Sequence, residues 1–293
     1  MDNSLTINEM HKEALLAQLS WQVEMGCDDA LIDDTALREE WHVSLASLTQ
    51  AAQVPNQQAS DQQAQSQQAP HQKAQEPKSP PISPATSSTV APSHTPNGLA
   101  DISSRDALKQ ALHDFEGCEL KRTATNMVFA DGNAEAKIMI IGEAPGKDED
   151  RMGLPFVGSA GQLLDQMLGA VGLDRTSTYI ANIMPWRPPG NRALTVEEIE
   201  MMRPFVEKHI SLIAPDVILS LGGTASKMML HSSDGIMKLR GKFHSYEPKI
   251  YGVSGTPLMA CLHPGYLLRA PHHKAFAFKD LVALRRKARE VGR

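Results

Sequence analysis

Four turns in the second half of this 293-residue chain contain side chains suited to binding and catalysis. They are residues 142–146 (GEAPG), Asn182, residues 222–225 (GGTA) and residues 263–269 (HPGYLLR). Each follows an apolar run typical of a strand buried on both faces. Because open α/β sheets bind ligands at the carboxyl ends of their parallel strands, we expect a carboxylate, an amide, a glycine-rich turn and a histidine to meet in one site.

The stretch over 142–164 combines a Gly/Pro turn with an acidic cluster and an aromatic ring, namely Glu143, Glu149, Asp150 and Phe156. Its spacing matches neither a P-loop nor the dinucleotide-binding fingerprint. One alternative is a plain strand-to-helix turn that needs a positive φ. Carboxylates beside an aromatic ring favour recognition of a flat polar ring, and we expect the following helix to offer its amino end to a phosphate.

The elements that must position these residues alternate between strands and helices. Expected strands are 137–142, 178–184, 216–222 and 256–262, and expected helices are 104–113, 159–171, 195–213, 224–230 and 274–290. Strands separated by helical stretches imply right-handed crossovers and a parallel sheet. The sequence therefore predicts an α/β fold, a three-layer α/β/α sandwich around a four-stranded, mostly parallel sheet.

Composition divides the chain into three parts. Residues 1–50 have 10 acidic and 2 basic side chains, residues 51–98 are rich in Gln, Ala, Pro and Ser, and residues 101–293 have 22 acidic and 25 basic ones. We predict an acidic helical segment over 1–50, a disordered linker over 51–98, and one globular domain over 99–293. The helix expected over 7–25 could dock on a replication or repair partner, or simply pack.

Cysteine usage and hydropathy exclude several classes of protein. The three cysteines are too few and too scattered for a disulfide framework or a zinc site. No apolar run is long enough to span a membrane, and no signal peptide opens the chain. We expect a cytoplasmic protein with no membrane partner.

The ordered motifs resemble those of the family 4 uracil-DNA glycosylases. GEAPG, GLPFVGSAGQLL, YIAN, RPPGNR, LGGTAS and HPGYLLR follow one another in that family's order across about residues 115 to 285. The resemblance implies a monofunctional enzyme of base-excision repair, a hydrolase that releases uracil from DNA and leaves an abasic site. A weakly catalytic or non-catalytic accessory protein that binds uracil-containing or abasic DNA is the alternative.

The resemblance also implies roles for residues around uracil. Phe156 would stack on the base, and Asn182 would pair with O4 and N3–H, which cytosine cannot match. His263 would donate to O2 as the uracil anion departs. Glu149 would crowd the C5 position and reject a thymine methyl group.

Two departures from the family concern water and cofactor. Ala144 lies beside uracil where a related branch has a water-orienting aspartate, so Glu143 or backbone carbonyls would hold the water. The family usually ligates a [4Fe–4S] cluster with four cysteines. Here only Cys118 remains, and we expect neither a cluster nor a metal. The other three positions contain apolar residues expected to pack together: Phe115, Trp186 and Met202.

DNA contacts are expected from the remaining turns. A backbone turn would approach a phosphate, an apolar wedge would enter the gap left by the flipped base, and arginines would bind phosphates. The residues expected in these roles are Gly223 and Thr224, Leu267 or Leu268, and Arg269 with Arg192.

Overall fold

The computed structural model describes residues 98–252 and 254–291. The expected acidic segment over 1–50, and almost all of the expected linker, lie outside the described residues. The described residues form a six-stranded sheet in the spatial order β1-β3-β2-β4-β6-β5. Its strands are β1 (Ala130–Gly132), β2 (Ile138–Gly142), β3 (Thr178–Asn182), β4 (Val217–Leu221), β5 (Phe243–Tyr246) and β6 (Thr256–Cys261).

The four expected strands are confirmed as β2, β3, β4 and β6, and they pair in parallel. Two strands were missed, because β1 and β5 are short and lack a continuous apolar run. Each pairs antiparallel along one edge, β1 with β3 and β5 with β6. The sheet is thus mixed and six-stranded, and its centre is the expected parallel one.

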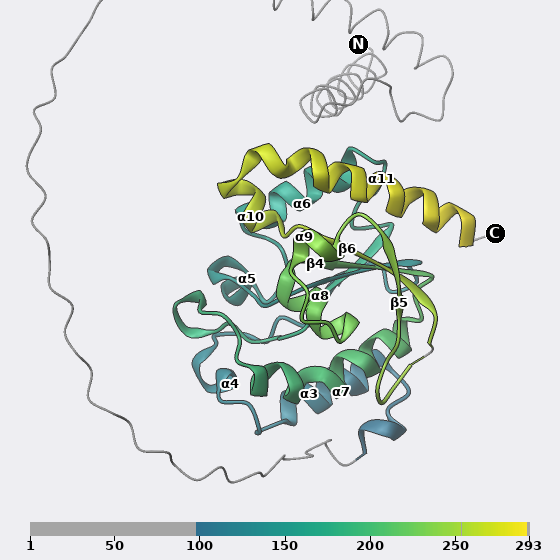
Figure 1. Cartoon of the computed structure of the whole chain (residues 1–293). Helices are drawn as coiled ribbons and strands as arrows, with labels where there is room; N and C mark the ends of the chain where they lie inside the picture. The colour runs from purple at the N-terminus through teal and green to yellow at the C-terminus, as the bar shows by residue number, and fades with distance from the viewer. Residues whose placement is uncertain (1–97, 253, 292–293) are drawn as a thin grey trace, which may run out of the picture. The chain divides into compact units, whose positions relative to one another are not determined.

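Helices cover both faces of this sheet (Figure 1). One face packs on α6 (Ser159–Gly169) and α11 (Lys274–Val291), and the other on α7 (Val196–Ile213) and α8 (Gly223–Leu230). Alternate residues of β2 divide between the two layers, with Ile140 in the first and Met139 in the second. This alternation follows from the strand's period of two, and it confirms the three-layer α/β/α sandwich.

A third apolar cluster lies between α7 and the amino-terminal helices α3 (Arg105–Asp114) and α4 (Leu120–Thr123). Ser104 is the N-cap of α3, since its Oγ accepts from the Ala107 N–H at 3.1 Å. Thr195 and Glu198 form a capping box that starts α7. The predicted starts of α3 and α7, at residues 104 and 195, lie one residue before the observed ones, at these two capping residues.

Several short helices were missed by the sequence analysis. They are α4, α5 (Lys147–Met152), α9 (Ile236–Leu239), α10 (Pro264–Arg269) and three 3-10 turns, η1 (Leu99–Asp101), η2 (Pro189–Asn191) and η3 (Pro271–His273). Such segments are too short to show apolar periodicity. In the described part of the chain, no helix is both long and apolar enough to cross a membrane.

Candidate active site

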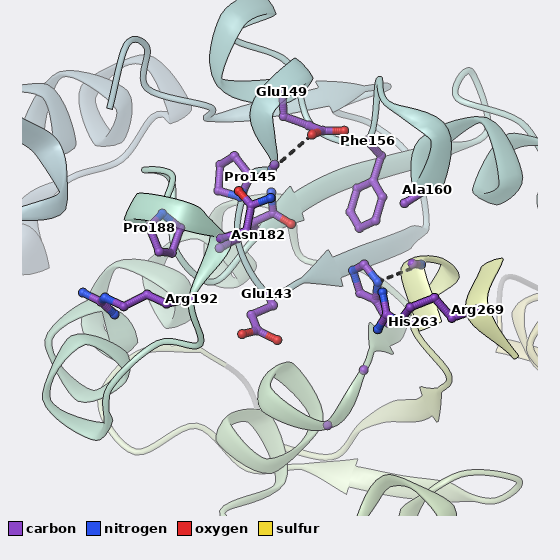
Figure 2. Close-up of a pocket in the computed structure, with 16 residues that line it drawn as sticks. Glu143, Pro145, Glu149, Phe156, Ala160, Asn182, Pro188, Arg192, His263 and Arg269 are labelled. Atoms are coloured by element: carbon purple, nitrogen blue, oxygen red, sulfur yellow. Dashed lines mark hydrogen bonds between the residues drawn. The ribbon is translucent and has the colours of Figure 1, made fainter. Parts of the chain in front are cut away.

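A cavity of about 400 Å³ opens at the carboxyl ends of the parallel strands. All four turns expected to converge contribute to it, and Figure 2 shows Glu143, Asn182 and His263 from three of them around one space. The expected site residues that line it are Glu143, Ala144, Glu149, Phe156, Asn182, Arg192, Gly223, His263 and Arg269. Thr224, Leu267 and Leu268 do not line the cavity.

Asn182 is positioned by the register of the sheet. It ends β3 directly opposite Gly142, the last residue of β2. The ladder continues past both strands, because the Ile183 N–H donates to the Gly142 carbonyl at 3.0 Å. Asn182 Oδ1 is buried and has no hydrogen-bond partner within the described ranges. Since a buried acceptor without a partner costs free energy, this atom is suited to accept from a bound ligand.

Gly142 is required here because the site residues crowd it. A Cβ on Gly142 would lie 2.4 Å from Asn182 Oδ1 and 2.6 Å from Phe156 Cζ. Both distances are shorter than real contacts. The absence of a side chain at this position therefore lets the amide and the aromatic ring share the floor of the cavity.

Phe156 is held in an unusual backbone conformation. Its φ is +53°, in the left-handed region that side chains other than glycine rarely adopt. The ring is buried and lies 5.7 Å from the His263 ring, measured between centroids. A Cβ on Gly161 would overlap the Phe156 carbonyl oxygen at 1.7 Å, so only glycine fits at position 161 in the first turn of α6.

Arg175 fixes this bend from a position distant in sequence. Its guanidinium donates to the carbonyls of Phe156 and Pro155, and it pairs with Asp131 at 2.6 Å and Asp165 at 2.9 Å. One side chain thereby joins β1, α6 and the loop between α5 and α6 that contains Phe156, called the aromatic loop below. Arg175 was not predicted as a site residue, because it belongs to no motif and the residues around it in the sequence do not indicate its contacts.

Glu149 is bound to the backbone of the same loop. Its Oε2 accepts from the Gly146 N–H at 3.1 Å, and its Oε1 accepts from the N–H groups of Val157 and Gly158 at 3.0 and 2.8 Å. The Glu149 carboxylate thus takes the N–H groups of the two residues that lead into α6, while a phosphate at the amino end of the helix itself stays a prediction. Asp150 similarly accepts from the Thr125 and Asn126 N–H groups at 2.8 and 3.1 Å.

His263 caps α10 with its ring. Nδ1 accepts from the Gly265 N–H at 3.0 Å, so in the neutral ring the proton resides on Nε2. Burial, aided by the positive charge of Arg269, lowers the pKa of His263 to about 4. At neutral pH the imidazole is uncharged and can donate from Nε2 toward the cavity.

Glu143 and the glycine turn complete the cavity. The Glu143 carboxylate points away from Asn182 (Figure 2). Gly222 is the N-cap of α8 with a φ of +91°, and a Cβ there would come within 3.1 Å of His263 Cβ. A glycine at 222 therefore allows α8 to begin close to the histidine.

The structure corrects one DNA-contact expectation, Leu267, and gives a second residue, Arg192, a partner within the chain. Leu267 is fully buried in the apolar layer with α6 and α11, so it cannot serve as an exposed wedge, whereas Leu268 is 45% exposed. Arg192 donates to both carboxylate oxygens of Glu198, at 2.9 and 2.6 Å, so its guanidinium already has an anionic partner. The helical period explains the error at Leu267, since neighbouring residues on α10 point about 100° apart and only one of the two leucines can face the core.

The residues expected to replace cluster ligands belong to one apolar cluster. Cys118, Trp186 and Met202 are at most 2% exposed and pack together, with Phe115 against them. Phe115 meets Phe205 edge to face at 5.1 Å. Burial raises the pKa of the Cys118 thiol, which disfavours the thiolate that a metal needs. Among the described residues, no group of three or more His, Cys, Asp or Glu could hold a metal ion.

Comparison with known proteins adds an independent finding. Residues 129–284 match the family model of the uracil DNA glycosylase superfamily. The chain is 37% identical over 174 residues to the type-4 uracil-DNA glycosylase of Archaeoglobus fulgidus, covering 58% of this chain and 86% of that protein. It is 39% identical over 165 residues to the type-4 enzyme of Thermotoga maritima, covering 56% of this chain and 83% of that one.

Proposed function

This chain belongs to the uracil-DNA glycosylase superfamily, and from that membership and the site geometry we infer that it hydrolyses the N-glycosidic bond of deoxyuridine in DNA. It is a DNA glycosylase of base-excision repair that releases uracil and leaves an abasic site. The observation that supports this most is the buried, unpartnered Asn182 Oδ1 beside the Phe156 ring. The accessory alternative is not favoured.

Uracil recognition is assigned to Phe156 and Asn182. An enzyme that acts on a base must turn it out of the stack, so the pocket must cover the face of the base and bind its pairing edge. The Phe156 ring would cover the face. Asn182 Oδ1 would accept from N3–H while its amide N–H donates to O4, a pairing that cytosine would meet with a donor against a donor.

Glu149 is assigned a structural role. Because three backbone N–H groups already bind its carboxylate, it fixes the loop that brings Phe156 to the pocket. It also lines the cavity, so it could exclude a thymine methyl group at C5 by its position.

Bond cleavage is assigned to His263, with Glu143 on the water side. As the C–N bond breaks, negative charge develops on uracil, and the neutral imidazole would donate from Nε2 to O2. Ala144 offers no base, so the reaction depends mainly on stabilising the leaving group. Glu143 or nearby backbone carbonyls would orient the water that attacks the sugar.

We propose that the family's iron–sulfur cluster is absent from this chain. One buried thiol beside Phe115, Trp186 and Met202 does not fit a centre that needs four thiolates. We also propose a cytoplasmic location, as expected from cysteine usage, and a replication or repair partner for residues 1–50. DNA contacts through Gly223, Thr224, Leu268 and Arg269 are proposed on the same basis, and Arg192 would have to exchange Glu198 for phosphate.

The function is tested with an oligonucleotide that contains one deoxyuridine. After incubation and alkali, we expect strand cleavage at that position, and a loss of about 10²-fold or more in Asn182→Ala, since one amide supplies two contacts to the base. Thymine- and cytosine-containing strands serve as substrate controls. If the wild-type protein binds uracil-containing DNA without cleaving it, the accessory alternative replaces this proposal.

Arg175→Lys is expected to slow uracil release by about 10- to 100-fold, because a lysine cannot hold both carbonyls of the aromatic loop and Phe156 would shift. Steady-state kinetics well below the melting temperature measure it. Arg151→Lys is the matched control, since the Arg151 side chain is exposed and, among the described residues, pairs with Asp148 alone, at 3.5 Å. If the Arg175→Lys protein is less stable but fully active, Arg175 contributes to stability and does not position Phe156 for uracil release.

A further inference from the structure

Beside the cavity, three aromatic rings from separate elements stack into one column. The column consists of Tyr266 on α10, His273 at the end of η3 and Phe276 on α11. Tyr266 and His273 lie 5.6 Å apart between centroids with planes at 23°, and His273 and Phe276 lie 5.5 Å apart at 29°. The Tyr266 hydroxyl and His273 Nδ1 are hydrogen-bonded at 2.7 Å. These contacts hold the rings in a fixed arrangement.

Both ends of the column are partly exposed, and the Phe276 end is anchored by an ion pair. Tyr266 is 36% exposed and Phe276 is 38% exposed. The Arg240 guanidinium lies 4.9 Å from the centre of the Phe276 ring and is bound by the buried carboxylate of Asp280. Fixed, partly exposed aromatic rings lose little entropy when they bind a flat partner, and such surfaces commonly mark binding sites.

The column is continuous with the cavity. Gly265 and Arg269, both on α10, line the cavity, and Tyr266 follows Gly265 directly. His263 and Arg269 lie on the same side of the cavity in Figure 2, next to α10. Tyr266 and Arg269 are three residues apart on α10 and are therefore neighbours on one face of that helix, so a strand that leaves the cavity past Arg269 runs toward Tyr266.

The charge around the column suits a phosphate backbone. Residues 264–279 include Arg269, Lys274 and Lys279 but neither aspartate nor glutamate. Arg269 and Lys279 are exposed. Aromatic rings within a basic surface are the combination by which proteins hold single-stranded nucleic acid.

We propose that Tyr266 is a stacking platform for an unpaired base next to the flipped deoxyuridine, so that this enzyme binds single-stranded DNA through the column. In uracil-free duplex DNA both faces of each base are covered by its neighbours and its pairing edge is occupied, so the ring gains little. In a single strand the base is free to stack. This proposal rests on the proposed function and specifies the class of DNA substrate.

The test separates binding from catalysis by using uracil-free DNA. Fluorescence anisotropy measures the affinity for a labelled oligothymidine strand and for a duplex of equal length, at one fixed salt concentration. Tyr266→Leu, which keeps apolar bulk without a ring, is expected to bind the single strand about 5- to 100-fold more weakly. Its duplex affinity is expected to change by less than about twofold. Tyr266→Phe keeps the ring and loses only the hydrogen bond to His273, so it should stay within about twofold of the wild type for both.

Ile250→Ala is the matched control, because Ile250 is an apolar residue of similar exposure, 47%, that does not line the cavity. Its backbone N–H donates to Glu207, and the substitution leaves that bond in place. Unchanged single-strand affinity in Tyr266→Leu, or an equal loss on duplex, would overturn the proposal. Uracil release from a single strand is measured in parallel. If the wild type releases uracil while Tyr266→Leu binds normally, only the platform fails; if the wild type releases none, the proposed function fails.

Discussion

Replacing His263 with alanine is expected to slow uracil release by about 10²- to 10³-fold, the usual effect of removing a donor aimed at a developing anion. With Nδ1 occupied by the Gly265 N–H, the Nε2 proton is the one available to the departing base. The loss should appear mainly in kcat, because the charge exists in the transition state and hardly at all in bound substrate. Single-turnover kinetics on a deoxyuridine oligonucleotide measure it.

A second variant separates catalysis from helix capping. Alanine also removes the cap of α10, which costs about 1 kcal/mol of stability. His263→Asn retains a capping oxygen but lacks the imidazole, so it should recover stability and remain as slow as His263→Ala. Recovery of activity in His263→Asn would show that capping, and not donation to uracil, is what His263 provides.

The pH dependence gives a further check on the same residue. Because burial lowers the pKa of His263 to about 4, the ring stays neutral where an ordinary histidine would take up a proton. The ratio of wild-type to His263→Ala rates is therefore expected to be constant between about pH 5.5 and 8. A step in that ratio near about pH 6.5 would mean that the ring titrates normally and acts in its charged form.

Gly142→Ala is expected to reduce kcat/KM for uracil release by about 10²-fold or more, although it adds only one methyl group. The new Cβ would lie 2.4 Å from Asn182 Oδ1 and 2.6 Å from Phe156 Cζ, so both uracil contacts must move. Overpacking at such a site costs about 1 to 3 kcal/mol of unfolding free energy. Enzyme kinetics give kcat/KM, and urea denaturation of the same preparation gives the free energy of unfolding.

Gly169→Ala is the matched control for this substitution. A Cβ at Gly169 would meet nothing within 4 Å, and the residue ends α6 away from the cavity. We expect wild-type activity and unchanged or slightly higher stability, since alanine favours a helix over glycine. If Gly142→Ala remained as active as Gly169→Ala, the pocket floor would be adaptable and the assignment of Asn182 and Phe156 would be weakened.

Much of the site could be predicted because it lies at the ends of strands. Buried strands appear as apolar runs, and parallel strands end at one edge, so Asn182 and His263 could be brought together before any coordinates. The starts of α3 and α7 were predicted within one residue, and the structure shows a capping side chain at each. The short edge strands β1 and β5, and the helix α5 inside the expected loop, have too few residues to produce a periodic pattern.

The sequence by itself determined the family, the parallel core and the set of turns that meet, because these depend on local patterns and ordered motifs. Only the tertiary structure decided how the side chains are used. Glu149 turns to the backbone, Leu267 faces the core while Leu268 faces solvent, and Arg175 reaches the Phe156 carbonyl across 19 residues. The physical reason is that hydrogen bonding and burial depend on groups brought together by the fold, and local sequence does not contain their distances.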